Sequence, residues 1–162
     1  MECPSHDGRL IPITITRHKK TKINGSANLL LYGYGSYGNS ISAGFSSSIF
    51  SLINRDIIWV TAHIRGGMEK GMKWWKEGKL TNKKNTFKDY IEVAKYLIDN
   101  KYTTKGKIIG MGGSAGGLLM GAVVNESPEL FLGIIMAVPF VDSLTTNLDH
   151  SLPLTVGEFD EF

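Results

Sequence analysis

A serine flanked by glycines lies where a strand is expected to turn into a helix. Residues 110–117 read Gly-Met-Gly-Gly-Ser-Ala-Gly-Gly, and an apolar run lies on each side of them. The pattern Gly112-x-Ser114-x-Gly116 fits a nucleophile elbow, in which a strained turn holds the serine hydroxyl above the sheet. Ser114 is therefore the candidate nucleophile of an acyl-transfer reaction.

The same segment leaves two other interpretations open, a phosphate-binding loop and a plain tight turn. Gly110-x-Gly112-x-x-Ala115 satisfies the glycine fingerprint of dinucleotide-binding loops. That fingerprint requires an acidic residue about 20 positions further on, whereas the first acid after the next apolar run is Asp142. The local pattern favours the nucleophile elbow over both alternatives.

Composition restricts the class of protein. The 162 residues are 42% apolar and 20% charged, which suits one ordinary globular domain or part of a larger one. The net charge is only +3, and the basic cluster at 17–22 has no interleaved aromatic residues, so we expect no nucleic-acid partner. The chain has a single cysteine, no apolar leader segment and no apolar run long enough to span a membrane, so we expect a cytoplasmic protein.

Strand-like and helix-like segments alternate along the chain. Short apolar or β-branched runs predict strands at 10–16, 29–32, 57–62, 107–111 and 133–138. This alternation predicts an α/β fold with a doubly wound, mainly parallel sheet, in which ligands bind beyond the carboxyl ends of the strands. Three loops are expected to meet there, at 33–38, at 63–67 and at the Ser114 turn.

Two helices are predicted with some detail. Apolar residues at steps of three and four predict a helix over 87–100, with Thr86 as its N-cap and Asp89 in its first turn. A second helix before the strand at 57–62 is expected to carry one apolar face, formed by Phe45, Ile49, Leu52 and Ile53.

Five ordered blocks of sequence resemble a known family. The blocks are Tyr32-Gly33-Tyr34-Gly35-Ser36-Tyr37-Gly38, His63-x-Arg65-Gly66-Gly67, Asn85-Thr86-Phe87-x-Asp89-Tyr90, Gly112-Gly113-Ser114-Ala115-Gly116-Gly117 and Pro139-Phe140-Val141-Asp142. Together they resemble the catalytic domain of the prolyl oligopeptidase family of serine peptidases, most closely its oligopeptidase B (protease II) branch. The resemblance covers nearly the whole chain and implies a partial α/β-hydrolase, peptidase catalytic domain over residues 1–162.

The resemblance implies a catalytic role for three residues. Ser114 is the expected acyl-accepting nucleophile. The backbone N–H of Ala115 and the hydroxyl of Tyr34 are the expected oxyanion donors. Their fixed dipoles would stabilise a developing negative charge more strongly in a water-poor site than in bulk water.

The resemblance also implies how substrate is selected. Glu158 is the expected partner of a basic P1 side chain, with Asp160 nearby, and Tyr37 falls where the family builds an aromatic pocket wall. A carboxylate suits this role because it pairs with guanidinium or ammonium groups. The implied activity is cleavage of short basic peptides after Arg or Lys through an acyl-enzyme, with no cofactor and no metal.

The resemblance implies that the family's catalytic Asp and His, and the last strands of its sheet, follow residue 162. It also implies that the family's propeller domain precedes residue 1. We therefore expect a chain that is inactive alone and an open sheet edge at 134–138. A second polypeptide that supplies the Asp and His and a decayed remnant without them both stay open. A compact triad of Ser114, His150 and Asp142 is a less favoured alternative. Two rival functions stay open, an esterase-like acyl hydrolase on the same fold and a non-catalytic assembly partner.

Overall fold

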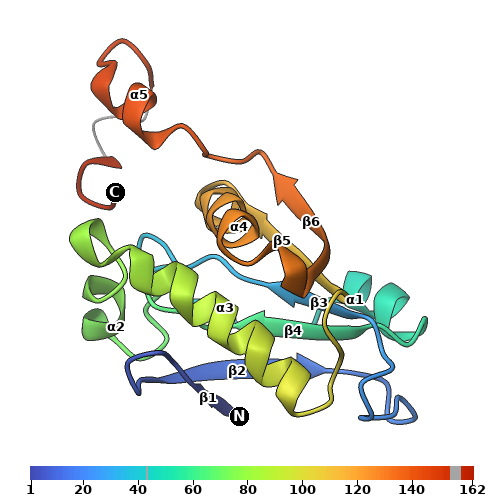
Figure 1. Cartoon of the computed structure of the whole chain (residues 1–162). Helices are drawn as coiled ribbons and strands as arrows, with labels where there is room; N and C mark the ends of the chain where they lie inside the picture. The colour runs from blue at the N-terminus through green and yellow to red at the C-terminus, as the bar shows by residue number, and fades with distance from the viewer. Residues whose placement is uncertain (43, 154–157) are drawn as a thin grey trace.

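A mixed β-sheet forms the centre of the fold (Figure 1). The computed structural model describes residues 1–42, 44–153 and 158–162, and in this part of the chain the sheet has six strands in the order β1-β2-β4-β3-β5-β6. The strands are β1 (Glu2–Pro4), β2 (Leu10–Thr16), β3 (Leu29–Tyr32), β4 (Ile58–Ala62), β5 (Ile108–Gly113) and β6 (Phe131–Ala137). β3 to β6 run parallel, whereas β2 pairs antiparallel with β1 and β4. The predicted α/β class with a mainly parallel sheet is confirmed.

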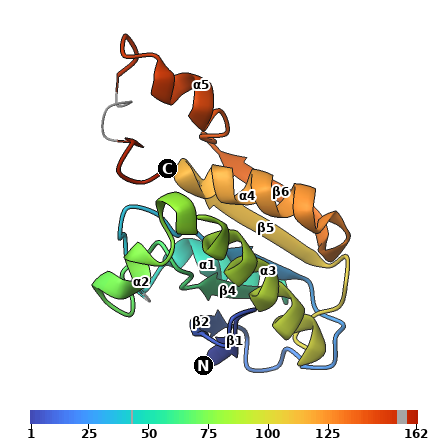
Figure 2. The ribbon, with the colours of Figure 1, turned by 60° about the vertical axis from the view of Figure 1, so that its left-hand side comes forward.

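Helices cover both faces of this sheet. The described helices are α1 (Ser47–Ile53), α2 (Met72–Lys76), α3 (Lys84–Asp99), α4 (Ala115–Glu126) and α5 (Ser143–Leu148), with short 3₁₀ turns η1 (Leu80–Asn82) and η2 (Pro128–Leu130). α5 stands apart from the sheet, beyond the end of β6 (Figure 1). α3 and α4 contact each other on one face, and α1 packs on β4 from the other (Figures 1 and 2). Among the residues described, no helix has the length and apolar character needed to cross a membrane.

The core between the sheet and α3 and α4 positions the loop that follows β3. Tyr90 on α3 and Leu119 on α4 are almost fully buried in one apolar cluster with Leu31 on β3. The Tyr90 hydroxyl donates to the Leu31 carbonyl at 2.6 Å. A Cβ on Gly33 would lie 2.9 Å from the Tyr90 ring, so the chain leaving β3 has to pass the core without a side chain. This close packing places the loop at 33–38 beside the start of α4.

The structure corrects two predictions about helices. α3 begins at Lys84, and Thr86 is not its N-cap, because the Thr86 hydroxyl is buried and donates to the carbonyls of Arg65 at 2.8 Å and Gly78 at 3.1 Å. Phe45 is not part of an inward-facing helix surface. It precedes α1, is 85% exposed and packs on Phe50, which is itself 46% exposed. Thus Thr86 serves tertiary contacts rather than capping, and the apolar face of α1 is narrower than the sequence suggests.

β6 is an edge strand of the described sheet, as predicted for residues 134–138. Its apolar side chains are largely uncovered, with Leu132 61% and Ile135 45% exposed. An unprotected apolar edge offers free backbone donors and acceptors to another chain. The surface along β6 is therefore the part of this sheet most prone to intermolecular pairing.

We predict that residues 1–162 expressed alone self-associate through β6. Leu132→Lys should shift the chain toward the monomer in sedimentation velocity, since a charge on an edge strand opposes pairing. Met72→Lys is the matched control, because Met72 is 50% exposed on α2, which lies on the side of the molecule away from β6 (Figure 1). A wild-type chain that stays monomeric at micromolar concentration would contradict the prediction.

Candidate active site

Ser114 lies in the tight turn between β5 and α4. Its φ of 54° and ψ of −119° are rare for a residue with a side chain. The turn is held from both sides, because the Ser114 N–H donates to the Ala137 carbonyl at 2.9 Å and the Ser114 carbonyl accepts from the Phe140 N–H at 3.0 Å. The side chain itself is exposed. This is the backbone geometry of a nucleophile elbow.

Two glycines around Ser114 are required by close packing. A Cβ on Gly112 would lie 2.2 Å from the Gly116 carbonyl oxygen, and a Cβ on Gly117 would lie 2.5 Å from Pro139 Cα. Real Cβ contacts do not become this short, so a side chain at either position would displace the first turn of α4. Gly112 thus has a steric cause within the turn itself, and Gly117 has one in its contact with the segment after β6.

The predicted oxyanion donors lie beside this turn. Ala115 is the first residue of α4, and an amide at that position has no intrahelical acceptor and favours nearby negative charge. Tyr34 packs beside the same turn, because a Cβ on Gly116 would lie 3.4 Å from Tyr34 Cδ2. Burial raises the pKa of the Tyr34 phenol, which keeps it protonated and able to donate. The structure brings Ser114, Ala115 and Tyr34 together, and their catalytic roles stay predictions.

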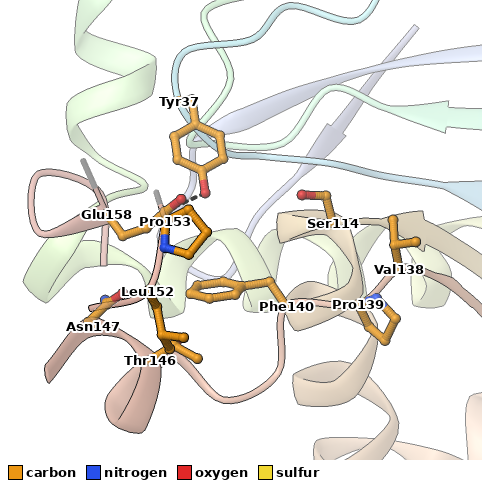
Figure 3. Close-up of a pocket in the computed structure, with 10 residues that line it drawn as sticks. All are labelled: Tyr37, Ser114, Val138, Pro139, Phe140, Thr146, Asn147, Leu152, Pro153 and Glu158. Atoms are coloured by element: carbon orange, nitrogen blue, oxygen red, sulfur yellow. Dashed lines mark hydrogen bonds between the residues drawn. The ribbon is translucent and has the colours of Figure 1, made fainter. Parts of the chain in front are cut away.

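A cavity of about 380 Å³ lies beside Ser114 (Figure 3). It is lined by Tyr37, Ser114, Val138, Pro139, Phe140, Thr146, Asn147, Leu152, Pro153 and Glu158. In Figure 3, Ser114 faces Tyr37 and Glu158 across the labelled group, and the Phe140 ring lies below the space between them. Asn147 carries no recognisable signal in the sequence. This residue is 7% exposed, and its Oδ1 has no hydrogen-bond partner within the described ranges, so the cavity wall holds a second acceptor besides Glu158.

Glu158 is held on the cavity wall by Tyr37. The Tyr37 hydroxyl donates to Glu158 Oε2 at 2.5 Å (Figure 3). Burial, and then the neighbouring Glu158 carboxylate, raise the pKa of Tyr37, so the phenol remains a donor at neutral pH. Tyr37 also packs edge-on against Phe162, with ring centroids 5.8 Å apart. The predicted wall residue therefore orients the predicted P1 acid.

The three acids near the end of the chain have different surroundings. Glu158 lines the cavity, whereas Asp160 is exposed and is not among the lining residues. Glu161 is only 2% exposed, and its carboxylate accepts from Trp75 Nε1 at 2.9 Å and from Lys83 Nζ at 3.4 Å. The structure does not bring Asp160 to the cavity with Glu158, so its role in binding substrate stays a prediction.

The compact triad considered from the sequence does not form. Within the described residues, no hydrogen bond links Ser114 Oγ to a histidine. The His150 ring packs near Phe159, with centroids 6.5 Å apart. Asp142 instead caps α5 by accepting from the Thr145 N–H at 3.1 Å. His150 and Asp142 therefore have structural partners of their own.

His63 also has partners away from Ser114. Its Nε2 forms a hydrogen bond with Thr14 Oγ1 at 2.8 Å, and its Nδ1 lies 3.5 Å from Glu69 Oε1. Throughout residues 1–42, 44–153 and 158–162, no group of three His, Cys, Asp or Glu side chains could hold a metal ion. The described site thus holds a serine, hydrogen-bond donors, the Glu158 carboxylate and the Asn147 Oδ1 acceptor.

Arg65 lies beneath the site in a buried ionic network. Its side chain is 1% exposed, and Nε and Nη2 donate to the Asp89 carboxylate at 2.8 and 2.6 Å, while Nη1 donates to Asp7 at 2.6 Å. Ser5 Oγ donates to the same Asp89 carboxylate at 2.5 Å. Burial alone would lower the pKa of Arg65, but its bonds to Asp89 and Asp7 raise it above the usual value. Arg65 therefore joins the N-terminal segment, the loop after β4 and α3.

A mainly parallel sheet with a strained serine elbow after β5 defines the class of α/β-hydrolases. A sequence profile of the prolyl oligopeptidase family matches residues 43–162. The chain belongs to this family, whose members similar to it are serine peptidases. The resemblance predicted from the five sequence blocks is confirmed.

Individual relatives are similar over nearly all of this chain. Dipeptidyl aminopeptidase BI from Pseudoxanthomonas mexicana is 49% identical over 160 residues, which are 98% of this chain and 22% of the relative. Protease 2 from Moraxella lacunata is 50% identical over 155 residues, which are 96% of this chain and 22% of the relative. The structure of oligopeptidase B from Trypanosoma brucei is 41% identical with a TM-score of 0.97, covering 100% of this chain and 23% of that chain. The chain thus spans 22% of the length of these curated relatives.

Proposed function

We propose that this chain supplies the nucleophile and the P1 pocket of a serine oligopeptidase that cleaves short peptides after Arg or Lys. The observation that carries the proposal is the Glu158 carboxylate, held by Tyr37 on the wall of the cavity that opens at Ser114. A cationic side chain entering a largely apolar cavity needs an anionic partner, because burying an unpaired charge is costly. The Asn147 Oδ1 offers such a side chain a second acceptor.

In this proposal Ser114 Oγ attacks the carbonyl carbon of the P1 residue while a general base takes the hydroxyl proton. The carbonyl oxygen becomes an oxyanion that accepts hydrogen bonds from the Ala115 N–H and the Tyr34 hydroxyl. The C–N bond then breaks as the amine is protonated, and water hydrolyses the ester on Ser114. The family resemblance implies that the base is a histidine from outside residues 1–162. Covalently bound antipain in the Trypanosoma brucei oligopeptidase B structure supports covalent chemistry in a relative.

The test uses a chimera, in which residues 1–162 replace the matching segment of Protease 2 from Moraxella lacunata. We predict that Glu158→Gln lowers kcat/KM for Arg and Lys amide substrates about 10- to 100-fold, because it removes a charged hydrogen-bond partner worth about 1.5 to 3 kcal/mol. Substrates with Leu at P1 should change little, since they form no ion pair. Steady-state kinetics with the two substrate series measure this difference.

The matched control is Glu129→Gln. Glu129 is 52% exposed in η2, at the amino end of β6 and so at the opposite end of the strands from Ser114. The Glu129→Gln variant should leave kcat/KM unchanged for both substrate series. If Glu158→Gln lowered kcat/KM equally for substrates with basic and with apolar P1 residues, Glu158 would not be the partner of the P1 side chain. A chimera that accepts esters far better than Arg amides, with no basic preference, would favour an esterase-like acyl hydrolase instead.

A further inference from the structure

A buried lysine lies between the two halves of the proposed site. Lys83 directly precedes α3, and its side chain is 10% exposed. Its Nζ donates to the Gly35 carbonyl at 2.8 Å, to Ser36 Oγ at 2.6 Å and to Glu161 Oε1 at 3.4 Å. Burial lowers the pKa of Lys83 to about 8, although the Glu161 carboxylate opposes this shift. Three acceptors offset part of the cost of burying this charge.

Two of these acceptors belong to the loop that carries the site tyrosines. Gly35 and Ser36 are the only residues between Tyr34 and Tyr37. Gly35 has a φ of +69°, and a Cβ there would lie 2.5 Å from Thr86 Cγ2, so the loop lies directly on the first turns of α3. Lys83 therefore fixes the backbone that places both the oxyanion tyrosine and the tyrosine that orients the P1 acid.

The third acceptor belongs to the turn that carries the P1 acid. The Glu161 and Phe162 N–H groups both donate to the Glu158 carbonyl, at 3.0 and 2.9 Å. Glu161 is itself held from three directions, because Trp75 Nε1 donates to its Oε2 at 2.9 Å, the Leu80 N–H donates to its carbonyl at 2.8 Å and Lys83 faces its Oε1. Displacing Glu161 would therefore move Glu158.

We infer that Lys83 is a positioning residue that sets the oxyanion loop and the P1 acid relative to each other, by holding Gly35 and Ser36 on one side and Glu161 on the other. The inference rests on the proposed function and assigns Lys83 no contact with substrate. It also gives Glu161 a different role from Glu158. Lys83 neutralises the Glu161 carboxylate, so that Glu158 is the acid directed at a basic P1 side chain.

Kinetics of the chimera test this inference, with kcat normalised to titrated active sites. Lys83→Met should lower kcat about 10- to 100-fold for every substrate, because the loop bearing Tyr34 loses its support. It should also raise KM several-fold for Arg at P1 but not for Leu at P1, because the turn bearing Glu158 is released. Glu161→Gln should raise only the Arg KM, since Lys83 still holds Gly35 and Ser36. A purely structural role would reduce the number of titrated sites and leave both KM values unchanged.

Lys84→Met is the matched control, because the adjacent Lys84 is exposed, and it should behave as wild type. If Lys83→Met alone does not fold, the double variant Lys83→Met/Glu161→Gln leaves no uncompensated buried charge and should show the same loss of kcat. Normalised kcat and KM values equal to wild type in either Lys83 variant would overturn the inference. A wild-type chimera with no preference for basic P1 residues would overturn the proposed function instead, and the kcat effect of Lys83→Met would still decide the role of Lys83.

Discussion

Replacing Ser114 with alanine in the chimera is expected to lower kcat by about 10⁶-fold, the loss typical of removing the nucleophile from a serine-peptidase triad. Alanine at position 114 would adopt the same backbone conformation, with φ 54°, that serine adopts. The turn should therefore be retained. The cavity wall formed by Tyr37 and Glu158 does not depend on the Ser114 hydroxyl. Affinity for a basic ligand should therefore survive while turnover disappears.

Burst and steady-state kinetics with an Arg amide measure this loss, and equilibrium binding of benzamidine measures the retained affinity. Ser47→Ala is the control, because Ser47 is an exposed serine at the start of α1. A Ser114→Ala variant that keeps turnover within about 100-fold of wild type would show that another group acts as the nucleophile.

The second large effect is expected in stability. Arg65→Gln should lower the free energy of unfolding by about 3 to 5 kcal/mol, because it leaves the fully buried Asp89 carboxylate without its cation. Among the residues that the structure describes, Asp89 would keep the Ser5 hydroxyl and the backbone N–H of residue 65 as donors. Urea unfolding of residues 1–162 at high dilution, which limits self-association, measures the change. Tryptophan fluorescence is a suitable signal, since the Arg65 guanidinium lies 5.8 Å from the Trp74 ring centre.

Arg9→Gln supplies the matched comparison. Arg9 also forms an ion pair, with Glu77 at 2.7 Å, but its side chain is 46% exposed. Exposed pairs contribute about 0.2 to 1 kcal/mol, because water and salt screen them. Similar losses of unfolding free energy in the two variants would refute the claim that the buried Arg65 network stabilises the fold more than an exposed ion pair does.

The parts of the fold that the sequence predicts are those whose cause is local. β2 and β3 coincide with the predicted runs because their residues are apolar or β-branched and bounded by polar loops. The Ser114 elbow is predictable because Gly112 is needed by packing against the Gly116 carbonyl, within a few residues of the serine. α2 is only five residues long, too short to produce a helical repeat, and it was not predicted.

The parts that the sequence does not predict depend on contacts between distant residues. Arg65 pairs with Asp89, 24 residues away, and with Asp7, 58 residues away, and Lys83 contacts Glu161 across 78 residues. Nothing in the local pattern separates Glu161 from Asp160, although one is buried and the other exposed. Thr86 likewise looks like a helix cap in the sequence, but its hydroxyl donates to the Arg65 carbonyl in the loop after β4. Side-chain chemistry indicates that such groups need partners, and only the fold determines which partners they find.

The most direct test of the account is the site of covalent labelling by a fluorophosphonate, located by peptide mass mapping in the chimera. We predict one adduct per chain, on the peptide that contains Ser114, lost in Ser114→Ala and slowed by benzamidine in the cavity beside Glu158. Labelling at a different residue, or labelling that persists unchanged in Ser114→Ala, would contradict the assignment of Ser114 as the acyl-accepting nucleophile.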